Sequence, residues 1–151
     1  MTMEEIKALV DNAETADLGF LDSEGMPQVR RVFCTCHKGV GRHLISTNTS
    51  SMHVQELLKN GNACLYFADG DKFQGLCLTG QAVCHQESFY REKLWHEGDE
   101  MYYPGGVTDE DYCVLEFIAE KGRFYGNLGK GDVTSEMLES WDDGAEWIGP
   151  A

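Results

Sequence analysis

Strand-like segments dominate this chain, and the helical segments between them follow no regular alternation. Patterns of alternating or clustered apolar residues predict strands at residues 16–22, 28–36, 43–47, 63–68, 73–84, 112–119 and 123–128. Helical spacing is found at 2–14, at about 51–59 and 86–95, and near 135–141. A doubly wound parallel sheet needs a helix after each strand. The pattern therefore favours a mainly β protein, an antiparallel barrel with peripheral helices.

Local signals add detail to this outline. Thr2 and Glu5 form a capping box that predicts the start of the first helix. Gly75 and Gly80 interrupt a long strand and predict bulges or bends. The run 120–122 predicts the turn of a final hairpin.

The chain is long enough to form a stable core without disulfide bonds. Its 151 residues fit a single domain, 1–151, with a core of about 16–128 and an acidic tail at 130–151. Six cysteines occupy mostly apolar, strand-like positions, as buried reduced thiols do in cytosolic proteins. Cys34 and Cys36 lack the second pair that a zinc site needs, so no metal is expected.

The charge of the chain limits its partners. A formal net charge of −14 repels nucleic acid and anionic membranes, so neither is an expected partner. An acidic N-terminus without a following apolar region, and no long apolar run, predict a cytoplasmic protein. A small anionic ligand would need a local basic pocket.

Two segments could supply such a pocket. The run Thr47-Asn48-Thr49-Ser50-Ser51 lies where a strand passes into a helix. Its hydroxyl groups can cap the helix, or its backbone amides can hold an anion, and the segment alone leaves both open.

Arg30 and Arg31 are adjacent on a strand and therefore point to opposite faces. Val32 and Cys34 share the face of Arg30, whereas Val29 and Phe33 share that of Arg31. One arginine must face the interior or an interface, where it needs an anionic partner such as a phosphate or the carboxylate of Glu116.

These segments, in this order, resemble the pyridoxamine 5′-phosphate oxidase-like family and its small bacterial branch, the general stress protein 26-like proteins. The resemblance covers residues 16–128 and rests on the pattern Gly25-x-Pro27-x-x-Arg30-x-Val32, the run 47–51, the strand 75–82, Leu94-Trp95 with the run 102–109, and the strand 112–117.

The resemblance implies a six-stranded antiparallel split β-barrel that forms a homodimer, with FMN bound at the interface and a small molecule as ligand or substrate. Carried over by position, the FMN-binding residues would be Arg30, Arg31, Val32, Phe33, Cys34, Thr35, Ser46, Thr47, Ser50, Ser51, His53, Gln74, Gly75 and Trp95. Trp95, with Tyr102 and Tyr103, could stack on the flavin or pack in the core or dimer interface. No catalytic residue can be assigned.

Two departures bear on function. Met52-His53 stands where the family usually presents Lys or Arg to the phosphate; a protonated His53 could donate, whereas Met52 cannot. The acidic end, 142–151, is unsuited to a phosphorylated vitamin, so true pyridoxamine phosphate oxidase activity is not expected.

The expected function is a flavin-dependent oxidoreductase of unknown substrate. The alternatives are non-catalytic binding of a flavin or another small ligand, and a structural dimer with an empty site.

Overall fold

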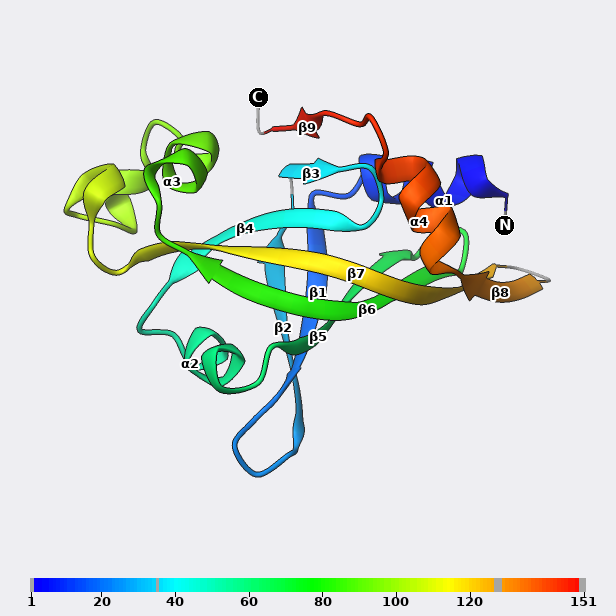
Figure 1. Cartoon of the computed structure of the whole chain (residues 1–151), viewed down its shortest axis with the longest axis horizontal. Helices are drawn as coiled ribbons and strands as arrows, with labels where there is room; N and C mark the ends of the chain where they lie inside the picture. The colour runs from blue at the N-terminus through cyan, green and yellow to red at the C-terminus, as the bar shows by residue number, and fades with distance from the viewer. Residues whose placement is uncertain (1, 35, 127–128, 150–151) are drawn as a thin grey trace.

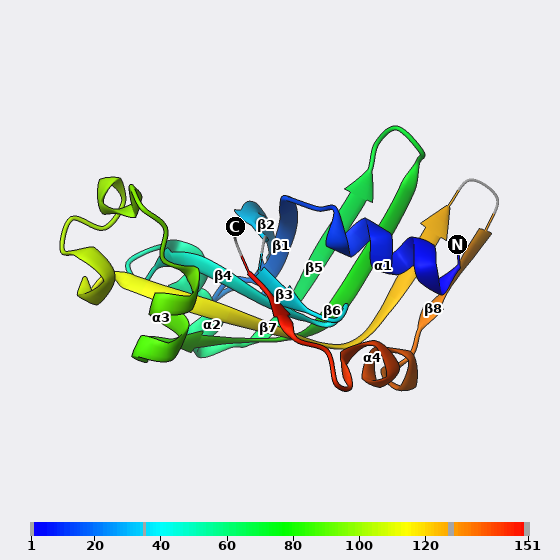
Figure 2. The ribbon, with the colours of Figure 1, turned by 90° about the horizontal axis from the view of Figure 1, so that it is seen from above.

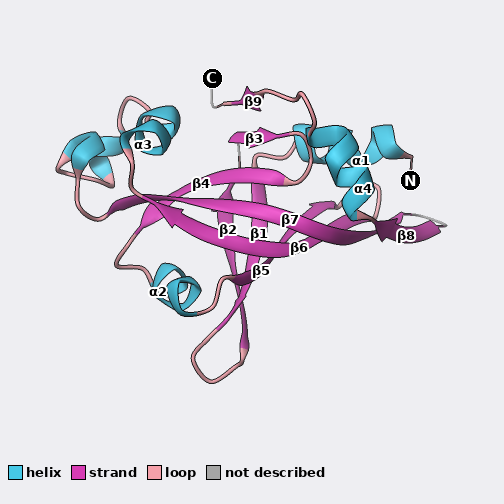
Figure 3. Ribbon diagram, in the orientation of Figure 1, coloured by secondary structure: helices cyan, strands magenta, loops and turns pink. Residues whose placement is uncertain are grey.

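Nine strands form one antiparallel sheet in the computed structural model, which describes residues 2–34, 36–126 and 129–149 (Figures 1 and 3). The strand order is β2-β1-β5-β6-β7-β4-β3-β9, and β8 pairs with β7. The elements are α1 (Met3–Asp11), β1 (Thr15–Leu21), β2 (Pro27–Phe33), β3 (Cys36–Lys38), β4 (Arg42–Asn48), α2 (Met52–Lys59), β5 (Asn62–Asp69), β6 (Gln74–His85), α3 (Ser88–Leu94), η1 (Asp99–Met101), η2 (Gly106–Thr108), β7 (Tyr112–Gly126), β8 (Gly129–Val133), α4 (Ser135–Asp142) and β9 (Trp147–Ile148).

The long pair β6 and β7 forms the spine of the sheet, and the other strands curl away from it on either side (Figure 2). The ladder between them runs from Gly75↔Tyr125 to His85↔Val114 and shifts register at Thr79/Gly80. A Cβ on Gly80 would lie 2.0 Å from the carbonyl oxygen of Ile118. The predicted bend at Gly80 is therefore confirmed. At Gly75 the register is regular, and the missing side chain makes room for the Tyr125 ring.

The concave side of the sheet holds the main core, which three helices help to close. Ile6 and Val10 of α1, Val54 and Leu57 of α2, and Leu138 of α4 pack into it with the inward residues of the strands. The predicted capping box starts α1, because the Thr2 hydroxyl accepts from the Glu5 amide and the Glu5 carboxylate accepts from the Thr2 amide. A second cluster under α3 includes Leu94, Tyr103 and Tyr112. No helix in the described ranges is long and apolar enough to cross a membrane.

The predicted fold class is confirmed, with two corrections. The described sheet has nine strands rather than six, because β3, β8 and β9 are short additions at its margins. The predicted hairpin around 120–122 is wrong: β7 continues through this segment, because Lys121, Gly122 and Arg123 pair with β6. The hairpin partner of β7 is β8, with Gly126 opposite Gly129.

Candidate functional site

A hollow of about 590 Å³ lies where β2 approaches β4 across the split of the barrel. Strand β2 and strand β4 supply one part of its wall, and α3 with the segment 96–103 supplies the other. The described lining residues are Arg30, Phe33, Leu44, Ser46, Thr47, Asn48, Leu94, His96, Asp99, Tyr102, Tyr103 and Gly149. Four predicted site residues, Arg30, Phe33, Ser46 and Thr47, therefore meet here.

Three side chains form a hydrogen-bonded relay at one end of this hollow. Arg30 Nη1 lies 3.0 Å from His53 Nδ1, and Thr47 Oγ1 lies 2.8 Å from His53 Nε2. Because a guanidinium can only donate, Nδ1 must be the acceptor. The ring hydrogen is then on Nε2, which donates to the Thr47 hydroxyl.

His53 lies behind the lining rather than in it. Its side chain is buried, and burial, followed by the positive charge of Arg30, lowers the pKa of His53 to about 4. The ring is therefore neutral near neutral pH. The expectation that a protonated His53 donates directly to a phosphate does not fit this placement, because both ring nitrogens already have protein partners.

The segment that leads from β4 into α2 binds a carboxylate of the protein itself. Asp111 accepts from Asn48 Nδ2 (3.0 Å), the Thr49 hydroxyl (2.8 Å), and the amide and hydroxyl of Ser50 (2.8 and 2.9 Å). The bonds from Thr49 and Ser50 lower the pKa of Asp111 from 3.8 to about 2. The run 47–51 thus binds an anion, and that anion is a carboxylate of the chain itself. The alternative in which its hydroxyl groups cap the helix does not hold, because Ser51, the N-cap residue of α2, makes no side-chain cap hydrogen bond.

Ser50 and Ser51 are consequently not brought into the hollow. The donors of Ser50 point to Asp111, and the Ser51 hydroxyl donates to the Asn48 carbonyl at 2.5 Å. Met52, the first residue of α2, is exposed and does not line the hollow either. Asp111 was missed from the sequence because it lies 61 positions from Ser50 and no local spacing links the two.

Asp111→Asn should make the protein less stable at about pH 7 and should reduce the acid dependence of its stability. A carboxyl group whose pKa is lower in the folded state stabilises above its unfolded pKa and loses that contribution as the pH falls through the folded value. The difference from wild type should therefore be full above about pH 5 and should fade between about pH 4 and 2. Thermal unfolding of the wild-type and Asp111→Asn proteins across this pH range measures the difference in stability.

Glu110→Gln is the matched control, because it removes the same charge one residue away. The Glu110 side chain is exposed and makes no hydrogen bond in the described structure. An Asp111→Asn protein that matches this control at all pH values would contradict the role given to Asp111.

The second predicted arginine faces away from the hollow. Arg31 Nε lies 3.2 Å from Asp17 on the outer face of the sheet, where its side chain is largely exposed. Glu116, the alternative interior partner for an arginine, instead pairs with Arg42 and with His85. Arg30 is therefore the arginine that the hollow receives.

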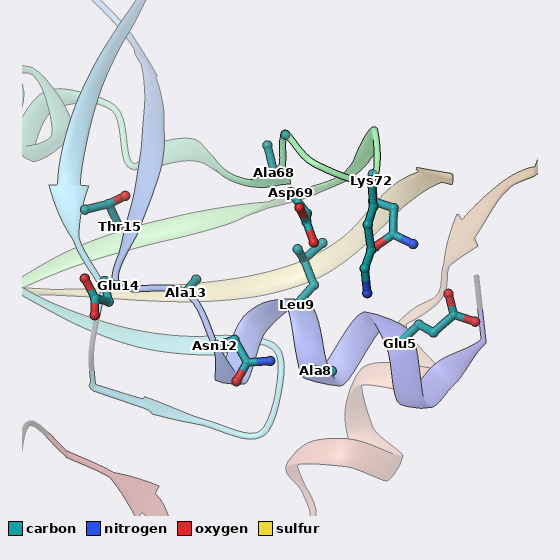
Figure 4. A pocket seen from close by; sticks show the side chains of 12 residues that line it. Glu5, Ala8, Leu9, Asn12, Ala13, Glu14, Thr15, Ala68, Asp69 and Lys72 are labelled. Atoms are coloured by element: carbon teal, nitrogen blue, oxygen red, sulfur yellow. The ribbon is translucent and has the colours of Figure 1, made fainter. Parts of the chain in front are cut away.

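Gln74 and Gly75 are likewise placed elsewhere. Gln74 lines a second hollow, of about 460 Å³, between α1 and the β5–β6 turn (Figure 4). Leu9 of α1 and Asp69 and Lys72 of the turn surround it. The two hollows share no lining residue, so one chain does not bring Gln74 to Arg30.

Other predicted residues are structural in a single chain. Val32 belongs to the main core. Cys34 is buried at 3.3 Å from His43 Nδ1, and burial raises the pKa of its thiol to about 12. Trp95 packs on Tyr103 and Tyr112, with ring centres 6.0 and 5.4 Å away, so the packing alternative holds for this residue. Thr35 lies outside the described residues.

Comparisons with known proteins agree with this architecture. A family model described as pyridoxamine 5′-phosphate oxidase matches residues 2–126. A solved structure from Clostridium acetobutylicum, described as related to general stress protein 26 of B. subtilis in the pyridoxinephosphate oxidase family, is 34% identical to this chain. The two match with a TM-score of 0.80 over 90% of this chain and 96% of that one.

More distant structures share the fold alone. General stress protein 26 from Bacillus anthracis strain Sterne is 12% identical, with a TM-score of 0.67 over 98% of both chains. A heme-binding protein from Mycobacterium smegmatis is 16% identical, with a TM-score of 0.67 over 91% of this chain and 60% of that one. No curated protein matches the sequence.

Proposed function

Because this chain belongs to the pyridoxamine 5′-phosphate oxidase family, we propose that its larger hollow binds FMN and that the loaded protein is a flavin-dependent oxidoreductase. The predicted resemblance to the general stress protein 26 branch is confirmed by the 34% identical clostridial structure. One observation carries the FMN proposal: Arg30 and Thr47 line the same hollow as the aromatic side chains of Phe33, Tyr102 and Tyr103.

The lining residues fit the two ends of such a ligand. Arg30 has N–H groups without a partner among the described residues, and its guanidinium matches the geometry of a phosphate. Phe33, Tyr102 and Tyr103 offer aromatic surface for a flat ring. A volume of about 590 Å³ lies within the roughly 300–1,000 Å³ of ordinary cofactor sites.

A second copy of the chain is the proposed partner. Strand β2 is the edge of the described sheet, and Val29 and Phe33 on it are 70% and 75% exposed. An edge strand with exposed apolar side chains is unusual for a monomer in solution. Phe33 also lines the hollow, so a partner packed on β2 would cover the opening of the site.

FMN, when bound, supplies the hydride or electron transfer. The residues of this chain bind and shield it: Arg30 and Thr47 hold the phosphate, and Tyr103 with Leu94 excludes water from one side. His96 and Asp99 are further polar residues of the lining, and the His96 amide donates to the Asp99 carboxylate at 2.8 Å.

Non-catalytic binding of a flavin or another small ligand is the second candidate. One observation favours it: Arg30 is the one permanently charged cation among the described lining residues, and His53 behind it is neutral. A weakly held flavin suits storage or sensing better than turnover.

The test uses freshly purified, full-length protein. We expect flavin absorbance bands, or quenching of added FMN fluorescence with saturation at one FMN per chain, and a dimer by light scattering. Consumption of NADH or NADPH by the loaded protein would support the oxidoreductase over the binding protein. Pyridoxamine 5′-phosphate should yield no hydrogen peroxide above the protein-free control.

Other outcomes would redirect the assignment. A heme Soret band without flavin bands would favour the ligand named for the mycobacterial neighbour. A monomer that neither contains nor binds flavin would contradict both the ligand and the partner proposed here.

A further inference from the structure

The relay of Arg30, His53 and Thr47 has a fixed direction. Arg30 donates to Nδ1 of His53, so the ring hydrogen lies on Nε2 and is donated to Thr47 Oγ1. The Thr47 oxygen thereby accepts one hydrogen bond, and its own hydrogen is left to be donated. No other partner of this hydroxyl is found in the described part of the chain.

The consequence is a subsite in which the side chains of Arg30 and Thr47 both offer hydrogen-bond donors. Both side chains line the hollow, Arg30 with N–H groups that have no partner among the described residues and Thr47 with an O–H that is left to donate. The free oxygens of a fully ionised phosphate monoester are all hydrogen-bond acceptors, so they can accept from both side chains. The terminal hydroxyl of riboflavin carries no charge and would accept fewer of these hydrogen bonds.

We propose that His53 is the positioning residue that sets this polarity and so makes the site selective for an ionised phosphate over the same ligand without it. The inference rests on the proposed function and extends it to the class of ligand that the hollow prefers. His53 does not touch the ligand; it acts through Arg30 and Thr47.

The surroundings of His53 keep it neutral in this role. Arg30 from β2 is the charged group against the ring, and it disfavours a second positive charge. The uncharged neighbours of His53 are Thr47 from β4 and Phe20 from β1. The ring centres of Phe20 and His53 lie 6.3 Å apart. A protonated ring would place two donors face to face at Nδ1 and would break the relay.

The experiment compares FMN with riboflavin in wild type, His53→Gln and His53→Leu. Glutamine carries one acceptor and one donor on a planar end group and can keep the direction of the relay. Leucine fills a similar space but has neither a hydrogen-bond donor nor an acceptor. We expect His53→Leu to lower the FMN-to-riboflavin affinity ratio roughly tenfold, the scale of one lost bond to an ionised group, with riboflavin affinity unchanged. His53→Gln should restore the ratio to within about threefold of wild type.

A pH series tests the neutral form. Between about pH 7.5 and 8.5 the phosphate is fully ionised and His53 stays neutral, so the wild-type ratio should be constant. A ratio that falls as the pH rises would mean that a protonated His53 holds the phosphate, and would overturn the inference. Equal ratios in all three proteins would overturn it too.

Nitrogen NMR of ¹⁵N-histidine-labelled, ligand-free protein provides a readout that does not depend on flavin. His53 should carry its hydrogen on Nε2 near neutral pH, and inorganic phosphate should shift its signals. That result without any FMN binding would contradict the FMN proposal alone. An Nδ1–H ring, or no response to phosphate, would overturn the subsite itself.

Discussion

Arg30→Ala should weaken FMN binding about 100-fold and should leave riboflavin binding nearly unchanged. Arg30 is the one permanently charged cation among the described residues that line the hollow, and the net charge of −14 of the whole chain repels a phosphate. Two hydrogen bonds to an ionised phosphate contribute roughly 1.5–3 kcal/mol each, and a loss of about 2.7 kcal/mol already gives 100-fold. Fluorescence titration of both ligands measures the change.

Arg123→Ala is the control for charge. Arg123 pairs with Asp132 on β8 and does not line the hollow, so its removal should change FMN affinity by less than about twofold. Equal losses in the two variants would mean that the general field of the protein, and not the hollow, governs binding. An Arg30→Ala protein with wild-type FMN affinity would place the phosphate elsewhere.

Gly80→Ala should destabilise the fold by about 3 kcal/mol or more, a large part of the roughly 5–15 kcal/mol that holds a domain together. The new Cβ would lie 2.0 Å from the Ile118 carbonyl oxygen and 2.9 Å from Ala119 Cα. Both are backbone atoms of β7, so no side chain can rotate to make room. Because β7 also pairs with β4, which carries Ser46 and Thr47, FMN affinity should fall with stability.

Urea unfolding followed by circular dichroism measures this loss, with Gly70→Ala as the matched glycine substitution. A Cβ on Gly70 meets nothing within 4 Å, and its backbone lies outside the left-handed region. Gly70→Ala should therefore be nearly neutral. A Gly80→Ala protein as stable as this control would show that the β6–β7 ladder can shift, contrary to the role given to its bend.

Much of the local structure could be predicted from the sequence, because local structure follows from short-range periodicity. The alternation along 28–36 placed Val32 and Cys34 inside and Val29 and Phe33 outside, and the structure confirms these four positions. Arg30, on the same face as Val32, is exposed. Gly80 marked the register shift of β6. The long β7 was missed because its interruption at 120–122 looks like a turn, and only pairing with β6 keeps that segment extended.

The candidate site shows the same division. The sequence by itself determined that Arg30 shares a strand face with Val32, that a hydroxyl-rich run precedes α2, and which family the chain resembles, because these depend on residue type and strand alternation. Only the tertiary structure decided that Asp111 binds the segment before α2 and that His53 joins Arg30 to Thr47. Those contacts link positions 6 to 61 residues apart. The pairing of Asn48 with Tyr112 between β4 and β7 brings Asp111 beside Ser50, and no local sequence pattern encodes that pairing.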